Sequence, residues 1–225
     1  MSGQIVAIGG GSFLADPASP LDDFLLSLAG RPSPRVCLLP TATGDSAVVI
    51  AAFFEAFARR DCRPSCLRLF GAPERPAERL LEQDVVYVSG GNTANALAVW
   101  RVHGIDRALR EAWERGAVLG GPSAGANCWF ECSVTDSFGP ELAPLRDGLG
   151  LLSGSFCPHY DGEERRRPVY RRLVDEGFPP GYAADDWAAL HFAGTELREV
   201  VAAREGARAY RVEPGGETPL EARLL

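Results

Sequence analysis

Short apolar runs alternate with amphipathic stretches through the first half of the chain. Each run is four or five residues long and leads into a loop of glycine, proline or polar residues, as buried strands do. The predicted strands are 4–8, 35–39, 66–70, 84–88 and 117–120. Helical spacing predicts helices at 21–29, 46–60, within 73–81, from the loop at 90–93 to about 103, and at 105–115. This alternation predicts a three-layer α/β/α fold with a mainly parallel sheet.

The second half of the chain lacks this alternation. After residue 127 we expect irregular polar loops and then a helix at 163–176. Short strands are predicted at 188–192, 199–203 and 208–212, with a turn at 214–216. Nothing in the composition of the 225 residues marks a boundary, so we predict a single domain over 1–225.

The helix predicted at 46–60 carries an apolar face. Val49, Phe53, Phe54 and Phe57 recur at helical spacing. We expect this row to lie in the core, where it would cover one face of the sheet.

The net charge and the cysteines indicate which kinds of partner and cofactor the protein is not expected to bind. The formal net charge of −7 and the scarcity of lysine argue against nucleic-acid binding. The six cysteines are expected to be reduced thiols, because a chain of this size needs no disulfides. Their spacing does not match a zinc site, and we predict neither a metal nor a cofactor. With no leader-like or membrane-spanning stretch, we expect a cytoplasmic protein that binds no membrane.

Two glycine loops follow predicted strands. The loop at 9–12 lacks the later glycine of a dinucleotide fingerprint, so we expect Gly10 to let the backbone approach a neighbouring loop or the substrate. The loop at 90–93 joins a strand to a helix and offers free backbone N–H groups, which makes it a candidate oxyanion hole. The alternative is an ordinary helix cap by Asn92 or Thr93.

A third glycine-rich stretch, 116–127, contains the candidate nucleophile. Gly121 and Gly125 flank Ser123 in a G-x-S-x-G pattern, between a predicted strand and a helix start. Such a turn exposes the hydroxyl and leaves the first N–H groups of the helix free to stabilise negative charge. The alternative is that Ser123 only caps the helix.

A serine nucleophile needs a base, and the chain has three histidines. His103 ends a helix and His191 lies in an apolar strand, so both are interpreted as structural. His159 follows Pro158 in a loop, where its imidazole can be aimed at the serine. Asp136 lies between Ser123 and His159 in the sequence and is one candidate for the orienting carboxylate. The competing carboxylates are Glu131, Asp161, Asp185 and Asp186.

Three segments together resemble a known family. They are Gly121-Pro122-Ser123-Ala124-Gly125-Ala126-Asn127, Gly90-Gly91-Asn92-Thr93 and Pro158-His159-Tyr160. In this order and at similar separations they resemble the serine peptidases that comprise aspartyl dipeptidase (dipeptidase E) and cyanophycinase, which share the class I glutamine amidotransferase-like fold. The resemblance extends from about residue 5 to the last strands and is loose beyond Asp161.

The resemblance implies a role for each residue of the site. Ser123 would be the nucleophile, His159 the base and Asp136 the third member of the triad. The N–H groups of Gly91 and Ala124 would form the oxyanion hole. The substrate would be a small peptide with an acidic residue on the acyl side of the bond, and the enzyme would be a homodimer. The remaining substrate-binding candidates are Gly10, Asn92, Thr93 and the arginines just after His159, which are Arg165, Arg166, Arg167 and Arg171.

Two other functions fit parts of the pattern. An α/β-hydrolase esterase would also show G-x-S-x-G, with His191 as its natural base. A non-enzymatic, amidotransferase-like binding module would keep the fold without the chemistry.

Overall fold

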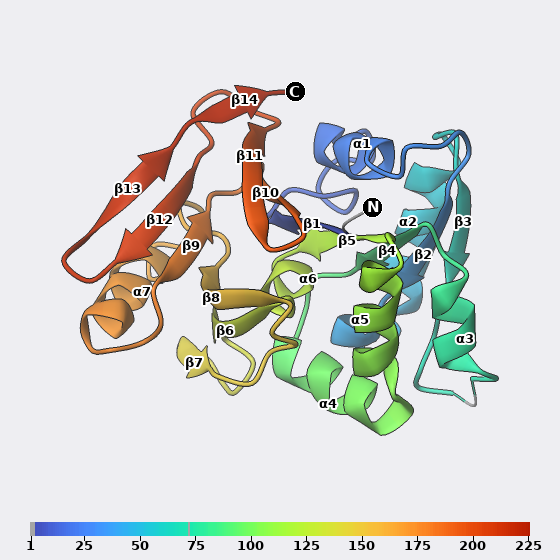
Figure 1. Ribbon diagram of the computed structural model, residues 1–225, viewed down its shortest axis with the longest axis horizontal. Coiled ribbons are helices and arrows are strands. Elements are labelled where there is room, and N and C mark those ends of the chain that lie inside the picture. Colours follow the sequence, from blue (N-terminus) through green and yellow to red (C-terminus); the bar gives the residue numbers. More distant parts are fainter. Residues whose placement is uncertain (1–2, 72) are drawn as a thin grey trace.

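The main sheet of the protein has eight strands. The computed structural model describes residues 3–71 and 73–225 and orders the strands β14-β11-β10-β1-β5-β4-β2-β3 (Figure 1). Their bounds are Gln4–Ile8 (β1), Arg35–Leu39 (β2), Arg63–Cys66 (β3), Val85–Val88 (β4), Val118–Pro122 (β5), Ala188–Ala193 (β10), Glu196–Ala202 (β11) and Ala222–Leu224 (β14). The first five are mutually parallel, and β10 pairs antiparallel with β1. The predicted mainly parallel sheet is therefore confirmed.

Helices cover both faces of this sheet, as predicted. One face packs against α1 (Pro20–Ser27) and α2 (Ala47–Phe57). The other packs against α3 (Pro76–Leu81), α4 (Thr93–His103), α5 (Ile105–Glu114) and α6 (Ala124–Asn127). A short 3-10 turn, η1, spans Thr41–Thr43.

Two local predictions were wrong, one about an edge strand of the main sheet and one about the buried face of α2. The strand expected at 66–70 is the more polar Arg63–Cys66, because pairing with β2 fixes the edge strand. In α2, Phe53 and Phe57 are fully buried, whereas Phe54 is 38% exposed. The helical spacing therefore identified the buried face of α2 but assigned it one residue too many.

A second sheet replaces the irregular loops expected after residue 127. Its order is β13-β12-β9-β8-β6-β7. The strands are Phe130–Thr135 (β6), Ala143–Leu145 (β7), Leu152–Cys157 (β8), Gly181–Ala184 (β9), Ala209–Glu213 (β12) and Gly216–Leu220 (β13). These strands are short and rich in small and polar residues, so the apolar pattern predicted only β12, as the strand at 208–212, and did not reveal the others. Hydrogen bonding between segments distant in the sequence creates this sheet.

The second sheet packs against the core of the first. The rings of Phe130 and Phe156 stack at 5.0 Å, and Phe130 meets Phe192 of β10 edge-on at 5.9 Å. The opposite face is covered by α7 (Arg166–Asp175), which buries Tyr170 and Val174 there. In Figure 1, α7 and the β12–β13 hairpin lie at one end of the molecule and β3 and α3 at the other.

Within residues 3–71 and 73–225, no helix combines the length and apolarity needed to cross a bilayer.

Candidate active site

Ser123 occupies a sharp turn between β5 and α6. Its backbone has φ 56° and ψ −112°, a conformation that costs a residue with a side chain about 1–3 kcal/mol. The Ser123 N–H donates to the carbonyl of Ile8 at 3.1 Å, and the Ser123 carbonyl accepts from Asn127 at 2.9 Å. These bonds hold the strained turn in place.

The flanking glycines are required by close packing. A Cβ on Gly121 or Gly125 would lie 2.0 or 2.3 Å from the carbonyl oxygen of Val88, at the end of β4. Two strand ends therefore meet at the turn. The helix-cap alternative for Ser123 is not supported, since its side chain makes no cap hydrogen bond to α6. A partly exposed serine on a strained strand-to-helix turn is the arrangement expected of a nucleophile.

The glycine loop after β4 lies beside this turn. Asn92 caps α4, because its side chain accepts from the Asn95 N–H at 2.8 Å. Its own N–H donates to Ala42 at 2.8 Å, and a Cβ on Gly91 (φ +128°) would lie 2.3 Å from that same carbonyl oxygen. Asn92 is thus the helix cap that the sequence predicted as the alternative for this loop. The cap lies next to Gly91, whose N–H is the predicted oxyanion-hole donor.

The two predicted oxyanion donors are unused. In the part of the chain that the structure describes, neither the Gly91 nor the Ala124 N–H donates a backbone hydrogen bond to another loop. Free N–H groups next to a nucleophile can stabilise the negative charge that develops when it attacks a carbonyl.

A cavity of about 320 Å³ unites the predicted residues. Its lining consists of Gly91, Asn92, Ser123, Asp136, His159, Glu163 and Arg166. Two sequence-predicted residues that are absent from this lining are Thr93, which is buried, and Gly10. The cavity is therefore lined by a serine, an imidazole, two carboxylates and one guanidinium.

His159 is oriented by a carboxylate from the second sheet. Its Nδ1 lies 2.6 Å from Oδ1 of Asp186. The hydrogen bond from His159 lowers the pKa of the Asp186 carboxyl below its ordinary value, although partial burial opposes this. An ionised carboxylate only accepts, so Nδ1 carries the proton and Nε2 keeps the lone pair that a base needs.

Asp136, our choice for the third member, does not contact the imidazole. Asp136, His159 and Asp186 follow the carboxyl ends of β6, β8 and β9, which are adjacent and parallel. His159 therefore follows the middle of the three strands, with one carboxylate on each side, and it pairs with Asp186. Asp136 is exposed in the cavity, on a hairpin tied to α4 by a hydrogen bond from Asn92 to the Ser137 carbonyl at 3.0 Å.

The other competing carboxylates have different partners. Glu131 accepts from the Gly154 N–H at 2.9 Å. Asp161 accepts from the backbone N–H of Asp186 at 2.8 Å, and Asp185 accepts from the backbone N–H of Arg208 at 3.0 Å. Of the five candidates, Asp186 is the one that orients His159. Asp186 was not singled out from the sequence, because the strand that precedes it, β9, was not predicted.

Gly10 lets the backbone approach neighbouring loops, which is one of the two roles expected for it. A Cβ there would lie 1.8 Å from Oδ1 of Asp186 and 2.7 Å from Nδ1 of His159. The backbone beside it holds the histidine, since the His159 N–H donates to the Gly9 carbonyl at 3.3 Å. The glycine loop after β1 therefore leaves room for the His159–Asp186 pair instead of lining the cavity.

One of the four candidate arginines lines the cavity. Arg165 pairs with Glu141 at 2.9 Å on the surface, and Arg171 approaches Glu217 at 4.0 Å, so neither lines the cavity. Arg166 does. Its side chain is 3% exposed, it pairs with Glu163 at 2.8 Å, and it donates to the Val134 carbonyl at 3.1 Å. The sequence showed an arginine run, but the helical phase of α7 determines which member faces inward.

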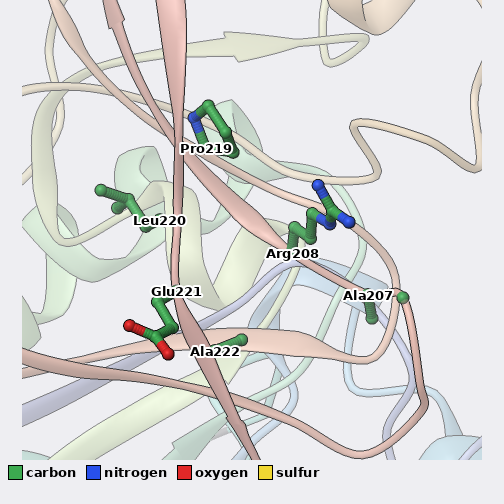
Figure 2. Close-up of a pocket in the computed structure, with 7 residues that line it drawn as sticks. Ala207, Arg208, Pro219, Leu220, Glu221 and Ala222 are labelled. Carbon is green, nitrogen blue, oxygen red and sulfur yellow. The ribbon is translucent and has the colours of Figure 1, made fainter.

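The remaining histidines and a larger hollow lie outside this site. His191 is buried in β10 and lies 2.8 Å from the Gln4 side chain, and His103 ends α4, in agreement with their structural interpretation. A hollow of about 420 Å³ lies between the β12–β13 hairpin and β14 (Figure 2). Its lining, with Arg208 and Glu221 as charged residues, includes no serine, cysteine or histidine. The candidate chemistry is therefore in the smaller cavity.

Solved structures of two other proteins are similar to this chain along nearly its whole length. A peptidase from an acI-B1 Actinobacterium superposes with a TM-score of 0.73 at 19% identity and covers 99% of this chain and 95% of its own. A putative peptidase E protein from Listeria monocytogenes EGD-e gives a TM-score of 0.65 at 20% identity, over 89% of this chain and 98% of its own. At these identities the likeness establishes the fold.

Proteins related in sequence identify the family. The uncharacterized peptidase YgaJ of Bacillus subtilis (strain 168) is 52% identical over 212 residues, which is 93% of this chain and 91% of that protein. Peptidase E of Pasteurella multocida (strain Pm70) is 29% identical over 134 residues, 56% of this chain and 57% of that protein. Residues 5–200 match the model of peptidase family S51. The resemblance inferred from the three motifs is thus confirmed, and the chain belongs to peptidase family S51.

Proposed function

We propose that this peptidase is a serine-type enzyme that hydrolyses small peptides through an acyl-enzyme on Ser123. One observation carries the proposal: a serine on a strained strand-to-helix turn shares a cavity with an imidazole whose far nitrogen is held by a carboxylate. Nucleophile, base and orienting group are the parts that serine hydrolysis requires.

The mechanism follows from these positions. Nε2 of His159 takes the Ser123 proton as the hydroxyl oxygen attacks the peptide carbonyl. The oxyanion is stabilised by the N–H groups of Gly91 and Ala124, while Asp186 stabilises the imidazolium. The imidazolium then protonates the leaving amine, and the C–N bond breaks. Water, activated by His159, cleaves the ester and restores Ser123.

The polar groups of the cavity favour a dipeptide with aspartate on the acyl side. The three hydrogen bonds of Arg166 to Glu163 and Val134 use three of its five N–H donors, so two remain for a substrate carboxylate. Asp136, exposed in the same cavity, would hold the α-ammonium of that residue. At about 320 Å³ the cavity is at the lower limit of small-molecule sites, which favours short substrates.

A dipeptide panel tests the proposal. Asp-X should be cleaved faster than Asn-X and X-Asp, and N-acetyl-Asp-X should be poor, because it lacks the ammonium. Ser123→Ala is the blank. Arg166→Lys should lose most of the advantage of Asp-X over Asn-X, whereas Arg165→Gln, changed one residue away on the surface, should keep it. If no acidic series is preferred, the aspartyl specificity fails while serine hydrolysis stands.

Labelling with a fluorophosphonate tests the serine chemistry itself. Folded protein should be labelled at Ser123, and His159→Gln should slow labelling more than His191→Gln does. No labelling of folded protein would favour the binding-module alternative. Dependence on His191 would favour the esterase. The homodimer and the cytoplasmic location stay predictions. Size-exclusion chromatography with light scattering would test whether the protein is a dimer.

A further inference from the structure

The turn that presents Asp186 to His159 is strained at the next residue. Trp187 has φ +67°, in the left-handed region that bulky residues avoid. Such a conformation is strained and persists only where the surroundings impose it. The groups that impose it therefore also determine where the Asp186 carboxylate lies.

Two backbone hydrogen bonds fix the peptide groups of Trp187. Its N–H donates to the Gly10 carbonyl at 2.8 Å, and its carbonyl accepts from the Ala203 N–H at 2.8 Å. The indole lies flat against the chain at Gly11, where a Cβ would be 2.4 Å from the ring. The strained residue is thus anchored to the loop after β1 and to the end of β11.

Arg204 stacks on the indole. Its guanidinium carbon is 3.7 Å from the ring centroid, whereas the next shortest such pairs among the described residues are at 4.9 Å. Within the same residues Arg204 is exposed and forms no ion pair, so no carboxylate neutralises its charge. A cation stacked on an aromatic face is attracted to it, so this contact favours the indole position that the strained turn requires.

We propose that Trp187 and Arg204 are positioning residues that hold the Asp186 carboxylate against His159, and that Arg204 also places its positive charge near this pair. The inference rests on the proposed serine mechanism, because it assigns a task within the His159–Asp186 pair. Neither residue touches the cavity that would hold the substrate.

The charges around Asp186 agree with this role. His159, Arg166 and Arg204 all lower the pKa of the Asp186 carboxyl, in that order, while burial raises it. The acidic neighbours are Asp161, which accepts from the Asp186 N–H, and Asp185, which precedes it. Removing the Arg204 charge leaves the His159–Asp186 pair with one cation fewer, so the pair binds a proton at higher pH.

The test measures two properties of the intact protein against pH: the rate of fluorophosphonate labelling, and the NMR signals of the His159 imidazole. In Arg204→Gln we expect the acid limb of labelling and the His159 titration to move up by about 0.3–0.5 pH unit at low salt, and less at high salt. Arg204→Lys should restore most of the wild-type limb, because it keeps the charge. Trp187→Ala should slow labelling about tenfold at its plateau, while Trp187→Phe should slow it less.

Arg211→Gln is the matched control. Arg211 also stacks on an aromatic ring, Tyr182, at 4.9 Å, but it pairs with Glu213 and does not line the cavity. The inference is overturned if Arg204→Gln and wild type titrate alike, or if Arg211→Gln shifts both profiles equally. Absence of labelling in wild type would refute the serine mechanism instead, and the His159 signals would still decide whether Arg204 acts on the pair.

Discussion

The two sides of the cavity are built by the same rule in two different sheets. On the nucleophile side, the Gly91 loop and Ser123 follow the carboxyl ends of β4 and β5, which are adjacent and parallel in the main sheet. On the base side, His159 and Asp186 follow the carboxyl ends of β8 and β9, which are adjacent and parallel in the second sheet. Both sheets thus deliver their functional groups at neighbouring strand ends.

The two sides differ in how they are held. The nucleophile side is fixed by backbone contacts among glycines and carbonyls at Val88 and Ala42. The base side depends on side-chain pairs between segments separated by 27 residues, as in the His159–Asp186 bond. We therefore expect the base side to be the more easily disabled without loss of the fold.

Replacing each of the two carboxylates that flank His159 by an amide, one at a time, should give the largest difference in activity. Asp186→Asn should lower kcat about a thousandfold to ten-thousandfold, because an amide at that position favours the wrong imidazole tautomer. Asp136→Asn should instead raise KM about tenfold and change kcat by less than about threefold. Steady-state kinetics on Asp-X dipeptides measures both. The reverse result would restore Asp136 as the orienting carboxylate.

A methyl group at Gly10 should disable the base side by steric contact alone. Gly10→Ala places a Cβ on top of the Asp186 carboxylate, which must move away from His159. We expect activity to fall about 100- to 1,000-fold, with a stability loss of about 1–3 kcal/mol. Gly216→Ala, where the Cβ would meet nothing within 4 Å, is the control for kinetics and urea unfolding. Unchanged kinetics in Gly10→Ala would contradict the steric argument.

The corresponding change on the nucleophile side is Gly91→Ala. The new Cβ would press on the Ala42 carbonyl and displace the N–H that is proposed to bind the oxyanion. Activity should fall about 10- to 100-fold, mainly in kcat, since only the transition state uses that donor. The rate of fluorophosphonate labelling should fall in parallel. A larger loss than in Gly10→Ala would show that the nucleophile side is the more sensitive one.

The smallest effect concerns the scaffold beneath the nucleophile side. Burial raises the pKa of Asp22 to about 7, although the Tyr87 hydroxyl donates to its carboxylate at 2.7 Å and opposes the rise. The folded protein therefore binds a proton there between about pH 4 and 7 that the unfolded chain has already lost, so this residue lowers stability as pH rises. Asp22→Asn should gain about 1–2 kcal/mol relative to wild type between pH 5 and 8, by urea unfolding. If Asp22→Asn and wild type differ in unfolding free energy by the same amount at pH 5 and pH 8, the raised pKa of Asp22 is contradicted.

The sequence predicted the main sheet well and the second sheet poorly. Strands such as 4–8 and 35–39 were predicted with their observed bounds, because a buried parallel strand is a continuous apolar run. The residues of β8, Leu-Ser-Gly-Ser-Phe-Cys, show neither a continuous run nor strict alternation. Their strand character comes from pairing with β6 and β9, and the sequence does not encode such pairing locally.

For the candidate site, the sequence alone determined the residues that act through their immediate neighbours. The G-x-S-x-G turn at Ser123, the glycine loop at Gly91 and the choice of His159 each depend on a short segment with its own backbone requirements. The tertiary structure alone decided that Asp186 and not Asp136 meets the imidazole, that Arg166 faces the cavity, and that Gly10 makes room for the His159–Asp186 pair. Those outcomes depend on which distant strands lie side by side and on the phase of one helix, and both are fixed only when the whole chain packs.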